Sequence, residues 1–182
     1  MNNSIYVIDI ETDNIDKHEG SIVEIACVRL DLRLKEMIKQ YSFVVKERDF
    51  IDSDAWIFKN SSLNYFEVIN GINLNFLFDV IQDCFFWGNF TCYNHLFDFS
   101  WLESRNFKIP NKFPDPMLIL TPIMKLKHDY YGNKFPSVVE SYYFLFEKKI
   151  VEEHRALSDA MVEAEIILEM NNRGYFNEVS TF

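Results

Sequence analysis

The stretch SIYVIDIET at residues 4–12 decides the fold of this chain. Residues 4–10 are an apolar run rich in β-branched side chains, which is typical of a strand covered on both faces. Asp9 and Glu11 stand near its end, and residues two apart on a strand project to the same side. Carboxylates that follow such buried sequence are costly unless they are paired or bind a metal ion. The alternative is that the strand ends here and water solvates both acids.

Working outward, other short apolar runs predict the rest of the sheet. Residues 22–30 and 36–46 are the next two strand candidates, and the short connections between them predict an antiparallel meander. Phe90, Cys92 and Tyr93 are expected in a short fourth strand. The sheet should therefore contain early antiparallel strands and at least one strand added later in the chain.

Helical spacing and turn residues predict helices between and after these strands. Residues 48–72 look irregular, and residues 117–126 predict a short strand or helix. The expected helices lie around 61–69, over 73–87 with Gly88 as its end, over 96–106, from Pro136 to about 146, and from Ala156 to Gly174. Strands followed by strands that alternate with helices predict one α/β domain, residues 1–182, around a mixed sheet.

The last helix carries a regular apolar pattern. Leu157, Met161, Ala164 and Leu168 recur at helical spacing on one side. This pattern predicts that Leu157 and Met161 define its buried face.

Size and composition fit one globular domain. The chain has 182 residues, of which 48% are apolar, with 18 Phe and 9 Tyr to fill a core. Its start is polar, and no uninterrupted apolar run could cross a bilayer, so we expect a soluble cytoplasmic protein without membrane contact. Cys27, Cys84 and Cys92 form no close pair, which predicts reduced, mostly buried thiols.

The charge balance is acidic. The net charge is -10 and the pI is about 4.8, which argues against a broad, non-specific grip on nucleic acid. It does not exclude a nuclease, because clustered catalytic acids add to the negative sum and bound divalent cations reverse the local sign. We expect a small footprint on any nucleic-acid substrate.

A second acid motif is NHLFD at residues 94–98. Asp98 follows the predicted fourth strand and falls in the first turn of the next helix, where the helix dipole favours a carboxylate. Alone, such an acid is usually a helix-terminal residue. His95 and Asp98 could also form a metal-binding pair, but no further nitrogen or sulfur ligand lies at motif spacing.

A third motif is HRALSDA at residues 154–160. Asp159 lies in the first turn of the last helix, and His154 lies on the loop just before it. Alone, this histidine is best explained as a solvated loop residue. Glu24, inside the second apolar strand, lies either at an exposed face or near the site, and we favour a structural role for it.

Together the three motifs predict a metal site. Each acid maps to the end of a strand or the start of a helix, where α/β folds place ligands. Four carboxylates brought together cannot all stay ionised unless cations join them. Oxygen ligands suit Mg²⁺ or Mn²⁺, and a histidine beside such ions can take a proton from water. This equipment favours two-metal phosphodiester hydrolysis.

The motifs together resemble the DEDDh 3′–5′ exonucleases over nearly the whole chain. The resemblance implies an α/β, ribonuclease H-like fold with a mixed sheet of about five strands and helices on both faces. The sequence is similar to members of this family such as the proofreading subunit of bacterial DNA polymerase III, ribonuclease T and oligoribonuclease. The third motif is the most specific of the three.

The resemblance also implies roles for the site residues. Asp9, Glu11, Asp98 and Asp159 would bind two divalent cations, Mg²⁺ or Mn²⁺, and His154 would be the general base. The substrate contacts would be Thr12, Asn94 and Phe97. Asp13 and Asn14 replace the Thr-Gly that often follows this Thr in the family, which changes the surroundings of the terminal nucleotide.

The expected function is therefore hydrolysis of single-stranded DNA or RNA from the 3′ end to nucleoside 5′-monophosphates. The protein partners that this interpretation admits are a second copy of the chain, as a homodimer, or a polymerase. The alternative from another class is a non-catalytic nuclease-fold module that binds a nucleic-acid end or a protein.

Overall fold

A five-stranded mixed sheet forms the centre of the computed structural model, which describes residues 4–127 and 132–176. The strand order is β4-β3-β2-β1-β5. The strands are β1 (Ser4–Thr12), β2 (Ile22–Asp31), β3 (Glu36–Lys46), β4 (Ile72–Asn73) and β5 (Phe90–Thr91). The first three form the predicted antiparallel meander, whereas β5 runs parallel to β1 and β4 runs parallel to β3.

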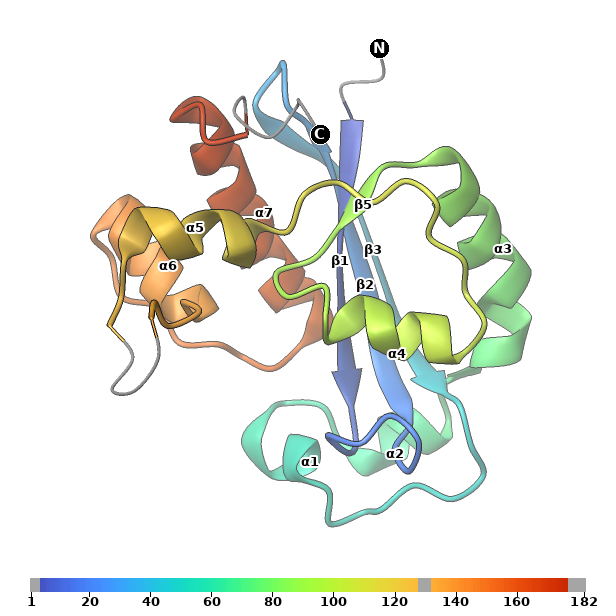
Figure 1. The fold of residues 1–182 in the computed structure, drawn as a ribbon. Coiled ribbons are helices and arrows are strands. Elements are labelled where there is room, and N and C mark those ends of the chain that lie inside the picture. Colours follow the sequence, from blue (N-terminus) through green and yellow to red (C-terminus); the bar gives the residue numbers. More distant parts are fainter. Residues whose placement is uncertain (1–3, 128–131, 177–182) are drawn as a thin grey trace.

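Helices cover both faces of this sheet (Figure 1). They are α1 (Trp56–Asn60), α2 (Tyr65–Ile69), α3 (Leu74–Trp87), α4 (Asp98–Ser104), α5 (Pro116–Met124), α6 (Val138–Phe146) and α7 (Ala156–Asn172). Buried residues of α5, α6 and α7 share one core cluster with β1 and β2. Those of α3 and α4 share another core cluster with the same two strands. The sheet therefore separates two cores.

Alternation along β1 fixes which core each side chain joins. Ile5 and Val7 pack in the core under α7, whereas Ile8 and Ile10 pack in the core under α3 and α4. Successive strand residues point to opposite faces, so the odd positions continue on the α7 side. The two acids at the end of β1 are thereby directed towards the helix that carries the third motif.

The buried face of α7 differs from the predicted one. Ala156, Ala160 and Ala164 are fully buried, whereas Leu157, Met161 and Leu168 are only partly buried. The prediction was right for Ala164 and right in part for the three larger residues, which are partly buried and pack against this core. Ile166, Ile167 and Met170 of the same helix are also fully buried, so the most buried face of α7 is not the one that the apolar pattern predicted.

The fourth predicted strand is shorter than expected. Only Phe90 and Thr91 form β5, and Cys92 and Tyr93 lie beyond it. The backbone of Phe90 also forms hydrogen bonds with a loop. Its N–H donates to Asn111 O at 2.9 Å, and its carbonyl accepts from Phe113 N at 2.7 Å. The chain then leaves the sheet, and the amide of Tyr93 donates a hydrogen bond to Glu163 of α7.

The segment between β3 and α3 contains more helix than predicted. The expected short helix is α2, but α1 precedes it in a region that looked irregular. Ile57, Leu63 and Val68 from this segment pack with Val23 of β2 in a third, small core. Burial of these side chains holds the segment against the sheet, close to the end of β1 (Figure 1).

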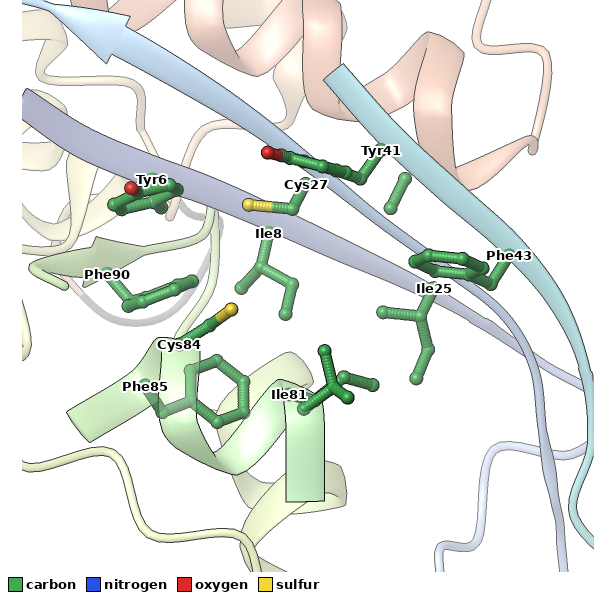
Figure 2. Close-up of a pocket in the computed structure, with 12 residues that line it drawn as sticks. Tyr6, Ile8, Ile25, Cys27, Tyr41, Phe43, Ile81, Cys84, Phe85 and Phe90 are labelled. Carbon is green, nitrogen blue, oxygen red and sulfur yellow. The ribbon is translucent and has the colours of Figure 1, made fainter. Parts of the chain in front are cut away.

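An apolar pocket of about 320 Å³ lies between α3 and the sheet. Figure 2 shows Cys27 of β2 and Cys84 of α3 pointing into it, beside the stacked rings of Tyr6 and Phe90. Burial raises the pKa of the Cys27 thiol. Cys92 is buried and Cys27 partly buried, so the prediction of mostly buried thiols is wrong only for Cys84, which is exposed. None of the described residues that line this pocket is Asp, Glu, Lys or Arg.

Candidate active site

A second pocket of the same volume, about 320 Å³, is lined by acids. Six carboxylates reach it, and none of its described lining residues is Lys or Arg. They are Asp9, Glu11, Asp98, Glu152, Asp159 and Glu163. His154 also lines it. The structure thus brings together all four acids and the histidine that the sequence motifs predicted, and it adds two glutamates that they did not.

Three elements deliver the predicted acids. Asp9 and Glu11 project from β1, Asp98 is the first residue of α4, and Asp159 lies in the first turn of α7. The amide of Ile10 donates to Asp98 Oδ1 at 3.3 Å, which ties α4 to β1. Both helices direct their N-terminal ends, and so the positive ends of their dipoles, towards the acids.

Glu11, His154 and Asp159 form the tightest group. Their ligand atoms all lie within 4.8 Å of one another. His154 has a left-handed backbone with φ of 51°, which is uncommon for a non-glycine residue and marks a constrained turn before α7. Its ring meets the edge of Trp56 with ring centroids 4.8 Å apart, so α1 helps to orient the imidazole.

The pKa values of these acids are raised. Burial, and then repulsion by other carboxylates, raises the pKa of Glu11 to about 8 and that of Asp9 well above its usual range. Burial raises the pKa of Asp98 to about 7, against the backbone hydrogen bonds that it accepts. Burial and Glu152 raise the pKa of Asp159 to about 6, although His154 opposes this. The protein without a cation therefore disfavours full ionisation of the pocket.

One fully buried acid oxygen has no hydrogen-bond partner among the described residues. Asp9 Oδ2 is buried and accepts no hydrogen bond there. The ion pairs between described residues include none of the predicted metal ligands. An oxygen-rich set with an orphaned carboxylate oxygen fits a hard divalent cation such as Mg²⁺ or Mn²⁺. The residues present therefore fit the metal ions that the motifs predicted.

Glu24 holds the third motif in place. Its Oε1 accepts from Arg155 Nη2 at 2.8 Å, and its Oε2 accepts from Arg155 Nε and from the amide of Ala156, both at 3.0 Å. Glu24 is only 1% exposed. These bonds fix the loop just before α7, and so the position of His154. Glu24 has the structural role that we favoured from the sequence.

The predicted substrate contacts divide into two groups. Asn94 and Phe97 line the acidic pocket, and Asn94 has a positive φ of 139° at the turn before α4. Thr12 does not line the pocket, and its hydroxyl donates to the carbonyl of Asn14 at 2.8 Å. The Asp13 carboxylate accepts from Ser21 N at 2.6 Å, so this departure from the family pattern closes the loop that follows β1.

His95 does not join the acids. Its Nε2 lies 3.1 Å from Thr91 Oγ1, and its ring lies against Phe99. The sequence argument against a His95–Asp98 metal pair agrees with this placement.

Sequence reasoning missed Glu163 and Trp56. Glu163 stands four residues after Asp159, so helical spacing places both on one face of α7. That spacing was a readable signal. The contact of Trp56 with His154 had no signal in the sequence, since the two residues are almost a hundred positions apart.

A family model matches most of the chain. The model of the RNase T family, described as Exonuclease, matches residues 6–167. No curated protein sequence matches the chain significantly. In the described part of the chain, no helix has both the length and the apolar character needed to span a membrane.

Solved structures share the fold at low sequence identity. The cell-death related nuclease CRN-4 superimposes with a TM-score of 0.72 at 13% identity, over 94% of this chain and 64% of that one. E. coli exonuclease I in complex with single-stranded DNA gives 0.72 at 15%, over 98% and 43%. A 3′-exonuclease that recognises the 3′ end of the histone mRNA stem-loop gives 0.74 at 14%, over 96% and 65%.

This chain spans less than two thirds of the length of each of these solved chains. The likeness shows the fold, and it confirms the predicted ribonuclease H-like architecture with a mixed sheet and helices on both faces.

Proposed function

Because the chain belongs to the RNase T exonuclease family, we propose that it is a metal-dependent 3′–5′ exonuclease that converts single-stranded DNA or RNA to nucleoside 5′-monophosphates. The family assignment confirms the DEDDh resemblance of the sequence and supports a nuclease activity that uses divalent metal ions. The observation that carries the finer proposal is the pocket in which Asp9, Glu11, Asp98 and Asp159 meet His154 without a compensating basic side chain.

Four carboxylates would hold two divalent cations, Mg²⁺ or Mn²⁺. Asp9, Glu11 and Asp159 would bind one cation, Asp9 would also contact the second, and Asp98 would act directly or through water. When bound, such ions lower the pKa of coordinated water and stabilise charge on the scissile phosphate. Burial and mutual repulsion raise the pKa values of these acids, so the metal-free pocket disfavours their ionised forms. Cation binding would be favourable because it would neutralise the ionised acids.

His154 would be the general base. Its ring lies within reach of the carboxylates of Glu11 and Asp159, so a water molecule between them and a phosphate would have a proton acceptor beside it. The Glu24–Arg155 pair fixes the backbone that follows it, and Trp56 contacts its ring. The imidazole therefore has an orientation set from two sides.

The substrate grip would be local. An acidic chain cannot hold long duplex through charge alone, so binding should come from the cations and from stacking on the last one or two bases. Phe97 lines the pocket, and Trp56 is 58% exposed beside His154. These rings favour unpaired or frayed 3′ ends with little sequence selectivity. Neither the fold nor the comparisons support a homodimer or a polymerase partner.

The proposal is tested with 5′-labelled single-stranded oligonucleotides. DNA and RNA of matched sequence, each ending in a 3′-hydroxyl or a 3′-phosphate, are incubated with Mg²⁺ or Mn²⁺ and resolved by length. We expect stepwise shortening from the hydroxyl ends, and we expect the 3′-phosphate to block it, because added negative charge would face the carboxylates. Equal cleavage of both ends, or of a closed circle, would refute a 3′ exonuclease. Binding without hydrolysis would favour the non-catalytic alternative.

A further inference from the structure

We propose that Glu163 is a fifth carboxylate of the divalent-metal centre, which binds or directly supports a cation held between Asp9 and Asp98. This inference rests on the proposed function and adds a residue that none of the three sequence motifs contains. It concerns the pocket acids outside the group formed by Glu11, His154 and Asp159.

The position of Glu163 puts its charge among the predicted ligands. It lies one helical turn after Asp159 on the buried face of α7, is only 4% exposed and lines the acidic pocket. Burial is the main cause of the raised pKa of Asp9, and repulsion by Glu163 is the next. Burial is likewise the main cause of the raised pKa of Glu163, and repulsion by Asp98 is the next. Asp9 of β1, Asp98 of α4 and Glu163 of α7 thus all line the same pocket.

The hydrogen bonding of Glu163 leaves ligand capacity. The amide of Tyr93 donates to Glu163 Oε2 at 3.1 Å, and Oε1 accepts no hydrogen bond from the described residues. Oδ2 of Asp9 is also buried and has no such partner. An orphaned oxygen on a neighbouring acid is an independent sign that a ligand belongs here, because buried polar atoms normally have partners.

A purely structural role does not explain the negative charge. The amide oxygen of a glutamine at this position could accept the same hydrogen bond from Tyr93 without adding a buried charge. A carboxylate instead adds repulsion against Asp9 and Asp98, which a bound cation offsets while the acids stay ionised. The choice of an acid over its neutral isostere is what points to the metal centre.

The experiment compares Mn²⁺ binding, measured by calorimetric titration, for the wild type, Glu163→Gln and Glu169→Gln. Glu169 is the matched control, because it lies on the same helix but pairs with Arg173 outside the pocket. We expect Glu163→Gln to weaken Mn²⁺ affinity roughly 10–100-fold, the range seen when residues that support metal ligands are changed. We expect Glu169→Gln to bind as the wild type does.

Melting temperature in chelator gives a second readout that does not depend on activity. Glu163→Gln should melt above the wild type there, since it removes one of the repelling charges, and Mn²⁺ should raise its melting temperature less. If Glu163→Gln cannot be purified folded, Glu163→Asp, which keeps the charge, should retain most of the Mn²⁺ affinity that Glu163→Ala loses.

The outcomes separate this inference from the proposed function. Equal Mn²⁺ affinities for the wild type and Glu163→Gln, or for the aspartate and alanine variants, overturn the role of Glu163 and leave the exonuclease proposal intact. A wild type that binds no Mn²⁺ overturns both. Selective loss of affinity in Glu163→Gln, with Glu169→Gln unchanged, supports the inference.

Discussion

Glu11 and Glu24 lie directly opposite each other on neighbouring strands, yet the protein treats them differently. Glu24 receives a guanidinium and a backbone amide, from Arg155 and Ala156. Glu11 has no ion pair among the described residues, and burial and nearby acids raise its pKa to about 8. One buried acid is neutralised within the chain, and its neighbour has no basic partner among the described residues.

The difference does not reflect a shortage of basic residues nearby. Arg155 is adjacent to His154 in the sequence, but its guanidinium pairs with Glu24 rather than with the pocket acids. A second mostly buried pair, Glu47 with Arg105, shows the same structural use of an acid at the loop after β1. Arginine therefore serves the structural acids, and the pocket acids remain uncompensated.

The largest effect should come from removing the cation or one of its ligands. Excess chelator, Asp9→Asn or Asp159→Asn should each reduce nuclease activity to the background of the assay, because in the proposed mechanism these acids would act only through bound metal. Circular dichroism should show that the variants keep the wild-type secondary structure. Full turnover in excess chelator would contradict the two-metal proposal.

His154→Ala should have the next largest effect. Loss of a general base lowers kcat by roughly 10²–10⁴-fold. The stabilisation by Mn²⁺ should survive, because all the carboxylates remain. Single-turnover assays together with melting curves test both parts, and near-normal turnover would mean that His154 is only a loop residue.

Arg155→Met should convert Glu24 into an uncompensated acid. Removing one partner of a buried pair costs about 3–5 kcal/mol of unfolding free energy, and here we expect the lower end because Arg155 is partly exposed. Activity per folded molecule should also fall, since the loop before α7 loses its anchor. Denaturant unfolding and activity assays measure the two effects.

Arg105→Met is the matched control for that variant. It leaves Glu47 without its guanidinium, but this pair lies outside the acidic pocket. It should lower stability while leaving activity per folded molecule close to wild type. Equal loss of activity in both variants would argue against a specific anchoring role for Arg155.

The smallest effect should be a pH dependence of stability in chelator. The folded carboxyl pKa values of about 6 to 8 exceed the unfolded values of 3.8 and 4.5, so the folded state retains protons that the unfolded state releases. The stability of the metal-free protein should therefore fall as pH rises from about 5 to 8. Saturating Mn²⁺ should reduce this pH dependence in calorimetric scans. Stability that rises with pH in chelator would contradict the raised pKa values.

Sequence patterns predicted most of the fold because local signals matched the tertiary structure. The β-branched runs became β1 and β2, and Gly174 takes a left-handed backbone with φ of 77° just after α7. The end of β5 could not be predicted from the sequence, because the backbone just after it bonds to a distant residue, with Tyr93 N donating to Glu163 Oε2 seventy residues away.

The site was predictable where residues lie within motifs and unpredictable where they come from packing. Asp9, Asp98 and Asp159 were predicted because each lies at a strand end or a helix start, and all three line one pocket in the structure. Trp56 reaches His154 only because the segment after β3 folds over the end of β1. The buried face of α7 was predicted only in part, because an apolar pattern does not show that Ala156 and Ala160 are more deeply buried than Leu157 and Met161.

The most direct test of the account compares the melting temperatures of the wild type and Asp9→Asn, in chelator and with Mn²⁺ at about 100 times its Kd. Binding at that concentration stabilises a protein by about 2.7 kcal/mol, or roughly 5–10 °C for a chain of this size. If the pocket acids are uncompensated until a cation binds, Asp9→Asn should melt above the wild type in chelator and should lose the rise with Mn²⁺. An Asp9→Asn protein that melts below the wild type in chelator and keeps the full Mn²⁺ rise would contradict the account.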